Sequence, residues 1–346
     1  MALVFHVDGP RWRAHLDRTL ADDPGLVPVV KGNGYGFGLD VLLSECARRH
    51  SQGGVDLVAV GTYGEARAAV SAIPGSVLVM EPYRAVLHAD LEHLGSTSMV
   101  HTIASREDLL DLTSRLTRPR VVLEGLTSMN RHGMAADQVQ ACAEDPAGAE
   151  VVGGTLHFPL DADRGHLPEL TSWLDVAGLD TWFVSHLSPS ELTSARVAYP
   201  GRTIRSRVGT RLWLGDPDAL SVRAQVLDVR AVRSGDRAGY RQRRLRAGHL
   251  LVVSGGTAQG VAMEAPTAAA TTRQRAVAVA EGVLEAAGRV RSPFTVAGRR
   301  TWFVEPPHMQ VSLVSLGEDA VPPRIGDEVE VRVRHTTLHA DAVVIS

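Results

Sequence analysis

One lysine stands where an apolar segment meets a glycine-rich turn. The run Val27–Val30 leads into Lys31, and glycines follow at positions 32, 34, 36 and 38. Glycine has no side chain, so the backbone of this turn can approach a bound molecule closely. A lysine amine attacks carbonyl compounds when burial or neighbouring cations lower its pKa. Lys31 is therefore a candidate for a covalent bond to a carbonyl compound, although most lysines are simply exposed.

The elements that position Lys31 follow a repeating pattern. From about Leu26 to Leu214, short apolar runs alternate with helix-like segments. The clearest helical segments are Leu39–Arg49, Gly64–Ala72, Ser105–Leu116 and Asp137–Glu144. Strands that alternate with helices indicate a parallel sheet, and about eight such units close a barrel. The sequence therefore predicts an α/β fold in which residues 1–214 form a (β/α)8 TIM-like barrel, with Lys31 at the carboxyl end of a strand.

The pattern changes in residues 215–346. Most apolar runs there have the length and alternation of strands, and a Pro/Gly/Asp turn precedes the alternating run Glu328–Arg334. We therefore expect a mostly β C-terminal domain, to which the first residues of the chain are candidates to add a strand. The alanine-rich segment 267–289 fits either a helix or a low-complexity excursion.

Composition sets limits on the partners. The chain has 346 residues, of which 44% are hydrophobic, and a formal charge of -3 from 36 basic and 39 acidic side chains. This balance favours neither nucleic acid nor a membrane surface, and the basic run Arg241–Arg246 is expected to be a solvated loop or edge. Cys46 and Cys142 fit no metal spacing and no disulfide framework. Without a signal-like start or a spanning apolar run, a cytoplasmic protein is expected.

The string Val29–Gly38 closely resembles the cofactor-lysine motif of alanine racemases, V-K-x-N-A-Y-G-H-G. Further segments resemble that family in the same order along the chain; they begin at Val58, Leu123, Gly154, Ser185, Ser206, Arg237, Gly255 and Pro307. The chain is thus identified as a divergent member of the alanine racemase family of fold-type III enzymes. The resemblance implies pyridoxal 5'-phosphate (PLP) as cofactor, an amino acid as substrate, and a homodimer in which each β domain completes the partner's site.

The resemblance also assigns roles to barrel residues. Lys31 would hold PLP and act as one proton-transfer base, and Arg131 would lie near the cofactor oxygen and the substrate carboxylate. Arg207 would face the pyridine nitrogen and keep it unprotonated, because arginine only donates hydrogen bonds. The ring is then a poorer electron sink, which favours racemase-like over decarboxylase-like chemistry. The other cofactor contacts implied are His157 at the ring and Tyr35, Ser190, Gly209 and Thr210 at the phosphate.

Several matching positions depart from the family pattern. Glu124 stands where many members carry a carbamylated lysine, and we expect its carboxylate to orient Arg131 directly. Thr257 stands where the family has the tyrosine that acts as the second base, and a threonine hydroxyl is far too weakly acidic for that role. Near it, His308 is an alternative proton donor, and the backbone of Met309 can still meet a substrate carboxylate.

Three functions therefore remain open. The first is a PLP-dependent amino-acid racemase or epimerase with an altered second base. The second is a one-base enzyme, either a lyase or a catalyst of α-proton exchange, and the third is a non-catalytic PLP-binding relative. Arg207, Glu124 and Arg131 favour the first over a decarboxylase, whereas Thr257 favours the second and third.

Overall fold

The computed structural model describes residues 2–88, 94–160, 165–176, 178–263 and 290–346. These residues form two compact units: a barrel unit (residues 15–34 and 38–215) and a β unit (residues 1–14, 35–37 and 216–346, within the described ranges). The alanine-rich segment 267–289 lies outside the described residues.

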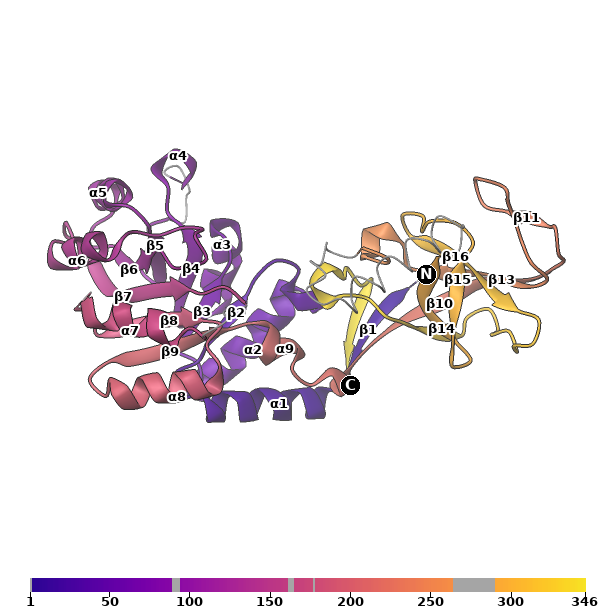
Figure 1. Cartoon of the computed structure of the whole chain (residues 1–346), viewed down its shortest axis with the longest axis horizontal. Helices are drawn as coiled ribbons and strands as arrows, with labels where there is room; N and C mark the ends of the chain where they lie inside the picture. Colours follow the sequence, from indigo (N-terminus) through magenta and orange to yellow (C-terminus); the bar gives the residue numbers. More distant parts are fainter. Residues whose placement is uncertain (1, 89–93, 161–164, 177, 264–289) are drawn as a thin grey trace. The chain divides into compact units, whose positions relative to one another are not determined.

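The barrel unit is a closed ring of eight parallel strands with helices around it (Figure 1). The strands are β2 (Val27–Val30), β3 (Leu57–Val60), β4 (Ser76–Pro82), β5 (Met99–Ile103), β6 (Arg120–Gly125), β7 (Glu150–His157), β8 (Thr181–Ser185) and β9 (Thr203–Val208). The helices are α1 (Gly9–Asp22), whose first turns belong to the β unit, α2 (Leu39–Ser51), α3 (Tyr63–Ala72), α4 (Ala85–His88), α5 (Arg106–Arg115), α6 (Ala136–Glu144), α7 (Leu167–Val176), α8 (Pro189–Ala198) and α9 (Thr210–Leu214). The predicted barrel is confirmed. Among the described residues, no helix is long and apolar enough to cross a membrane.

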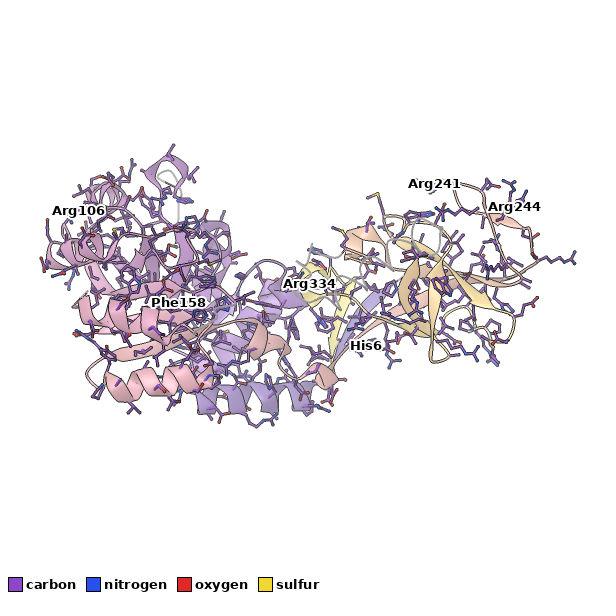
Figure 2. The ribbon with its side chains drawn as sticks, viewed as in Figure 1. His6, Arg106, Phe158, Arg241, Arg244 and Arg334 are labelled. Atoms are coloured by element: carbon purple, nitrogen blue, oxygen red, sulfur yellow. The ribbon has the colours of Figure 1, made fainter. Side chains whose placement is uncertain are left out.

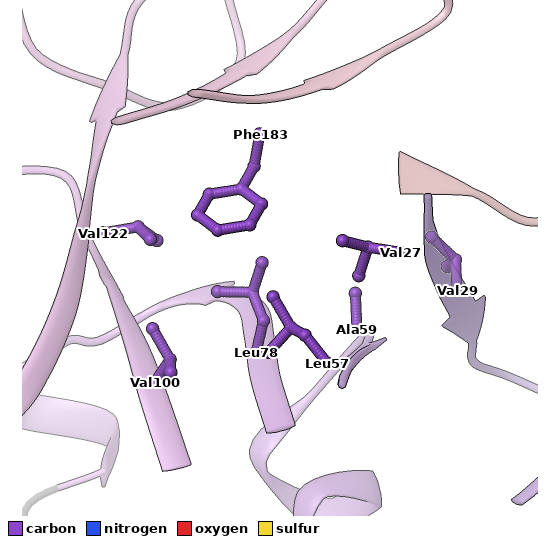
Figure 3. Close-up of a cluster of buried hydrophobic side chains, with 8 residues drawn as sticks. All are labelled: Val27, Val29, Leu57, Ala59, Leu78, Val100, Val122 and Phe183. Atoms are coloured by element: carbon purple, nitrogen blue, oxygen red, sulfur yellow. The ribbon is translucent and has the colours of Figure 1, made fainter. Parts of the chain in front are cut away.

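The interior of the barrel is filled by aliphatic side chains and one phenylalanine. They come from strands all around the ring and meet in one buried cluster (Figure 3): Val27, Val29, Leu57, Ala59, Leu78, Val100, Val122 and Phe183. Because side chains alternate between the two faces of a strand, these positions define the inward face of the six strands that contribute them, β2 to β6 and β8. The apolar core therefore fills the barrel interior beneath the carboxyl ends of the strands.

Several helices begin with side-chain caps that fix the loops at this end of the barrel. Thr62 caps α3 and Ser188 caps α8, and in both helices a glutamate three residues later completes a capping box. Ser105 caps α5. A cap satisfies amides that have no partner within the helix, so each loop from strand to helix is held by specific hydrogen bonds.

The β unit is built around one mostly antiparallel sheet, as the sequence predicts. Its strands are β1 (Leu3–Val7), β10 (Leu220–Val232), β13 (Gly248–Ser254), β14 (Arg291–Val296), β15 (Arg299–Phe303), β16 (Val311–Gly317), β17 (Glu328–Val331) and β18 (Ala342–Ile345). The N-terminal β1 lies between β10 and β18, so the start of the chain belongs to this sheet. Short 3-10 turns follow β13 (η3, Thr257–Gln259) and β17 (η4, His335–Thr337).

A separate two-stranded hairpin carries the basic run. It pairs β11 (Arg237–Ala238) with β12 (Arg243–Arg244). The labelled side chains of Arg241 and Arg244 point outward from it (Figure 2). Arg241, Arg244 and Arg246 are exposed, as expected of a solvated loop.

The packing of β7 against β8 generates a prediction about stability. A Cβ atom added at Gly154 would lie 2.5–2.9 Å from ring atoms of the buried Trp182. We expect Gly154→Ala to lower the free energy of unfolding by about 1–3 kcal/mol, the usual cost of overpacking a core. Gly201→Ala is the matched control, since nothing lies within 4 Å of its added Cβ. Urea unfolding followed by tryptophan fluorescence measures both, and equal midpoints would contradict the packing described.

Candidate active site

Polar side chains form a layer directly above the apolar core of the barrel. A residue two positions after an inward-facing residue also points inward. By this rule Lys31 points inward because it lies two positions after Val29, and Glu124 points inward because it lies two positions after Val122. Ser185 points inward in the same way, two positions after Phe183. His157 is paired with Ser185 in the register of β7 and β8. Arg207 lies two positions after Arg205, which is paired with Phe183 in the register of β8 and β9. Residues from strands distant in sequence thereby meet at the face where barrel enzymes carry their active sites.

Lys31 lies at the mouth of the barrel in an environment that disfavours its charge. The side chain keeps solvent contact. Partial desolvation lowers the pKa of Lys31, the charges of Arg131 and Arg207 lower it further, and Glu65 opposes them. A lower pKa leaves more of the amine neutral at physiological pH, and the neutral amine is the form that attacks carbonyl groups and accepts protons.

A glutamate that the sequence analysis did not single out clamps the loop of Lys31. Glu65 accepts hydrogen bonds from the amides of Gly32 at 2.6 Å and Gly61 at 2.7 Å, and from Thr62 at 3.1 Å. It therefore ties the turn after β2 to the start of α3. Glycine at position 61 leaves space for the Glu65 carboxylate, because an added Cβ there would lie 3.1 Å from Cβ of Lys31 and 2.8 Å from Oε2 of Glu65. The capping-box spacing Thr62-x-x-Glu65 is the sequence signal for this residue.

A hydrogen-bond chain joins Arg207, Ser185 and His157. Nη2 of Arg207 donates to the carbonyl of Leu156 at 2.9 Å and to Oγ of Ser185 at 3.1 Å, and that hydroxyl lies 2.9 Å from Nδ1 of His157. Arginine never accepts, and within the described part of the chain His157 is the one acceptor for the Ser185 proton. The serine therefore donates to Nδ1, and the ring proton of His157 lies on Nε2. Burial lowers the pKa of His157 to about 3, and the nearby Arg207 and Arg131 charges add to this effect, so the ring is neutral.

Ser185 is a second residue that sequence reasoning missed. It begins the Ser-His-Leu-Ser-Pro-Ser segment, in which only Ser190 was assigned a role. The period-two alternation Thr181, Phe183, Ser185 along β8 was the available signal, because it places Ser185 on the inward face.

Two buried polar atoms in this layer lack partners. Nε of Arg207 and Oε2 of Glu124 are both buried and make no hydrogen bond within the described ranges. Burial lowers the pKa of Arg207 to about 10, which still leaves it charged at neutral pH. Burial raises the pKa of Glu124, against the opposing effects of Arg207, Arg131 and Arg84. An unsatisfied buried donor costs free energy, so the free N–H of Arg207 indicates a site built for an acceptor that the protein itself does not supply.

Arg131 is exposed at the mouth of the barrel and has no ion-pair partner in the part of the chain that the structure describes. The expected direct contact with Glu124 is not made in this structure; the two side chains influence each other only through their charges. The physical reason is that Arg131 leaves the barrel in the loop after β6, whereas Glu124 stays buried within the strand. Arg131 is thus an unpaired cation that can receive a carboxylate.

The loops after β8 and β9 each start a helix. Ser190 lies in the first turn of α8, where its hydroxyl is 3.1 Å from that of the cap Ser188. Gly209 is the N-cap of α9, and Thr210 is its first residue. Amides in a first helical turn have no partner within the helix, and loops after the last two strands of such barrels frequently hold phosphate. These residues can therefore hold an anion.

The remaining residues of interest belong to the β unit. Tyr35 is buried there, and Phe37 of the same segment packs on Phe5 and Trp12. Thr257 and Met309 are exposed.

The described ranges contain no cluster of three or more His, Cys, Asp or Glu side chains that could hold a metal ion. Cys46 and Cys142 are both buried and free. Burial raises the pKa of each thiol, which makes both cysteines poor nucleophiles.

A parallel barrel that presents a lysine of lowered pKa at its carboxyl end, combined in one chain with an antiparallel β unit, is the architecture of the fold-type III class. Within this class, the sequence model of the family described as "Alanine racemase, N-terminal domain" matches residues 11–183. The chain belongs to the alanine racemase family.

Solved structures show the same fold. The biosynthetic alanine racemase of Pseudomonas aeruginosa is 21% identical with a TM-score of 0.67, over 96% of this chain and 91% of that one. Alanine racemase from E. faecalis is 20% identical with a TM-score of 0.70, over 95% and 88% of the two chains. The enzyme from Bartonella henselae, solved with covalently bound pyridoxal phosphate, is 18% identical with a TM-score of 0.72 over the whole of both chains. No curated protein sequence matches this chain.

The Arg207–Ser185–His157 chain predicts a tautomer. In nitrogen-15 NMR of the ligand-free protein, Nδ1 of His157 should be unprotonated and Nε2 protonated, with no titration between about pH 5 and 8, because the pKa is about 3. Ser185→Ala should weaken the tautomer preference. Ser172→Ala, an exposed serine on α7 that donates to its own helix, is the control. A ring that titrates near the ordinary histidine value would contradict the hydrogen-bond chain.

Proposed function

We propose that this protein binds PLP covalently on Lys31 and acts at the α-carbon of an amino acid as a racemase or epimerase. The observation that carries the proposal is the unpartnered, buried Nε–H of Arg207 in the same polar layer as a lysine of lowered pKa. A buried charge with an unused donor is costly unless a ligand completes it, and ionisable groups with perturbed pKa values cluster at functional sites.

The residues of the barrel fit the cofactor. The free Nε–H of Arg207 matches an acceptor nitrogen in an aromatic ring, and the neutral His157 can pack against that ring without competing for protons. Ser190, Gly209 and Thr210 would hold a phosphate at the start of α8 and α9. By resemblance, Tyr35 would contribute to the same phosphate.

The chain's own residues supply binding and proton transfer. When bound, PLP withdraws electrons from the substrate's α-carbon and so acidifies its hydrogen. Lys31, whose lowered pKa leaves more of its amine in the neutral form, accepts that proton at Nζ. Arg131 binds the substrate carboxylate, since it carries no competing ion pair among the described residues. Glu124 balances part of the positive charge of Arg207 and Arg131 and in this way supports their orientation.

The one-base alternative also has a specific observation behind it. The position of the family's second base is Thr257, whose hydroxyl cannot exchange protons near neutral pH. A protein with Lys31 alone would exchange the α-proton of one enantiomer with solvent and return the same enantiomer. The non-catalytic alternative, a PLP-binding relative, would use the lowered pKa of Lys31 only to form the bond to the cofactor.

We further propose a homodimer. In the family pattern each β unit completes the site of the partner subunit. The exposed Thr257 and Met309 and the half-buried His308 are the residues that would do so here. The Met309 backbone would meet the substrate carboxylate.

Deuterium exchange tests this function. PLP-loaded protein incubated with a panel of L-amino acids in deuterated water should incorporate deuterium at the α-carbon of at least one of them. Borohydride should fix the cofactor on Lys31, and Lys31→Ala should lose both label and exchange. Chiral analysis then separates inversion from exchange with retention. A label on a different lysine, or exchange that survives Lys31→Ala, would overturn the proposal.

A further inference from the structure

His308 lies in a prearranged cluster of the β unit that the family resemblance does not explain. It belongs to the turn that joins β15 to β16. Nε2 of His308 lies 2.7 Å from Oε1 of Glu305, and the Glu305 side chain is only 3% exposed. Nδ1 of His308 has no hydrogen-bond partner among the described residues, and the His308 side chain is 23% exposed.

Glu305 is held as a carboxylate acceptor from three directions. Besides His308, it accepts hydrogen bonds from the amides of Tyr240 at 3.1 Å and Arg241 at 3.3 Å, in the hairpin between β11 and β12. Burial raises the pKa of Glu305, but the hydrogen bonds from His308 and the two amides outweigh it and leave the pKa below its usual value. Glu305 therefore stays ionised, and as an ionised carboxylate it can only accept from the imidazole.

The approach of the hairpin to this carboxylate is built into the backbone. Gly239 has φ +78°, and a side chain there would collide with the Glu305 carboxyl group. Only glycine meets both conditions. The ring of Tyr240 then lies 4.6 Å from that of His308 at an interplanar angle of 39°. Glu305 binds Nε2 of His308, and Tyr240 packs beside the ring. These two contacts fix the imidazole and leave Nδ1 available to a ligand.

The cluster is joined to the position of the family's second base. The amide of Thr257 donates to the carbonyl of His308 at 2.9 Å, and the amide of Ala258 donates to that of Met309 at 2.9 Å. A side chain at Gly256 would collide with the same His308 carbonyl. His308 therefore lies directly beside the threonine that replaces the tyrosine, on a loop bonded to it.

We infer that the Glu305–His308 pair supplies the proton to the second face of the substrate, with His308 as the acid–base group and Glu305 as its positioning residue. This inference rests on the proposed function and on the proposed dimer. In one direction Lys31 takes the α-proton, and Nδ1–H of protonated His308 delivers a proton to the opposite face of the α-carbon. His308 is left neutral with its remaining proton on Nε2, facing Glu305, and Lys31 is left as the ammonium. Exchange with water, or turnover in the reverse direction, restores both groups.

The contrasting interpretation is that Glu305 merely fastens the hairpin. The two differ in what they change. A fastening role affects folding, cofactor binding and both proton transfers together, whereas the inferred role affects inversion and leaves exchange by Lys31 intact. The ratio of inversion to exchange therefore separates them within one reaction mixture.

The experiment compares wild type with four variants, His308→Ala, Glu305→Gln, Glu328→Gln and Thr257→Tyr. All are full-length, PLP-loaded protein in deuterated water, and the substrate is an amino acid that wild type exchanges. Wild type should invert at a rate comparable to exchange. His308→Ala should slow inversion about a hundredfold or more, the range of general acid–base catalysis, and change exchange less than about twofold. Glu305→Gln should slow inversion roughly tenfold to a hundredfold, because a neutral amide supports the imidazolium less well. Glu328→Gln is the matched control, since it removes the carboxylate from the His6–Glu328 pair of the same unit.

A second readout does not depend on activity. In nitrogen-15 NMR of the ligand-free protein, recorded where the ring carries a single proton, His308 should hold that proton on Nε2 and leave Nδ1 free. A singly protonated ring with its proton on Nδ1 would overturn the inference.

The outcomes separate the two claims. Inversion that survives His308→Ala, wild-type exchange without inversion, or equal loss of exchange and inversion in Glu305→Gln would each overturn the role of this pair while leaving Lys31 chemistry intact. Faster inversion in Thr257→Tyr with no effect of His308→Ala would do the same. Absence of any exchange in wild type contradicts the proposed function itself.

Discussion

The burial of one guanidinium group within a closed barrel is the constraint on which the site depends. Arg207 cannot leave the interior, because it extends inward from β9 and its Nη2 is bound to Leu156 and Ser185. Burial lowers the pKa of both Lys31 and His157, the charge of Arg207 adds to this effect, and the bond to Ser185 selects the tautomer of that histidine. One buried cation thus acts on a candidate nucleophile and on a candidate ring-packing group, and it retains one donor for a ligand.

The two units divide the chemistry. On the proposed function, the barrel supplies the groups that bind the cofactor and remove a proton from one face, and these groups lie on inward strand positions or in the loops that directly follow. The β unit carries a histidine oriented by a buried glutamate, next to Thr257, which the resemblance matches to the family's second base. On the proposed function, the imidazole of His308 takes over the acid–base role of the phenol at the neighbouring position.

The sequence was sufficient to predict features that depend on local pattern. Strand and helix periodicity predicted the barrel, and alternation along each strand accounts for the inward positions of Lys31, Glu124 and Arg207. The contact between Glu124 and Arg131 was predicted from side-chain chemistry alone, and it is absent. The sequence could not exclude it, because no local pattern specifies the conformation of the loop after β6 that carries Arg131. Glu305 was missed for a related reason: its partner amides lie more than sixty residues earlier in the chain, and only the folded sheet brings them together.

The central claim is that Arg207 holds the cofactor ring through its free Nε–H and so keeps the ring nitrogen unprotonated. Nitrogen-15 NMR of the protein reconstituted with PLP labelled at the pyridine nitrogen tests this directly. The account predicts the chemical shift of an unprotonated nitrogen that accepts a hydrogen bond, and a shift toward the protonated value in Arg207→Glu. A protonated pyridine nitrogen in the wild-type protein would contradict it.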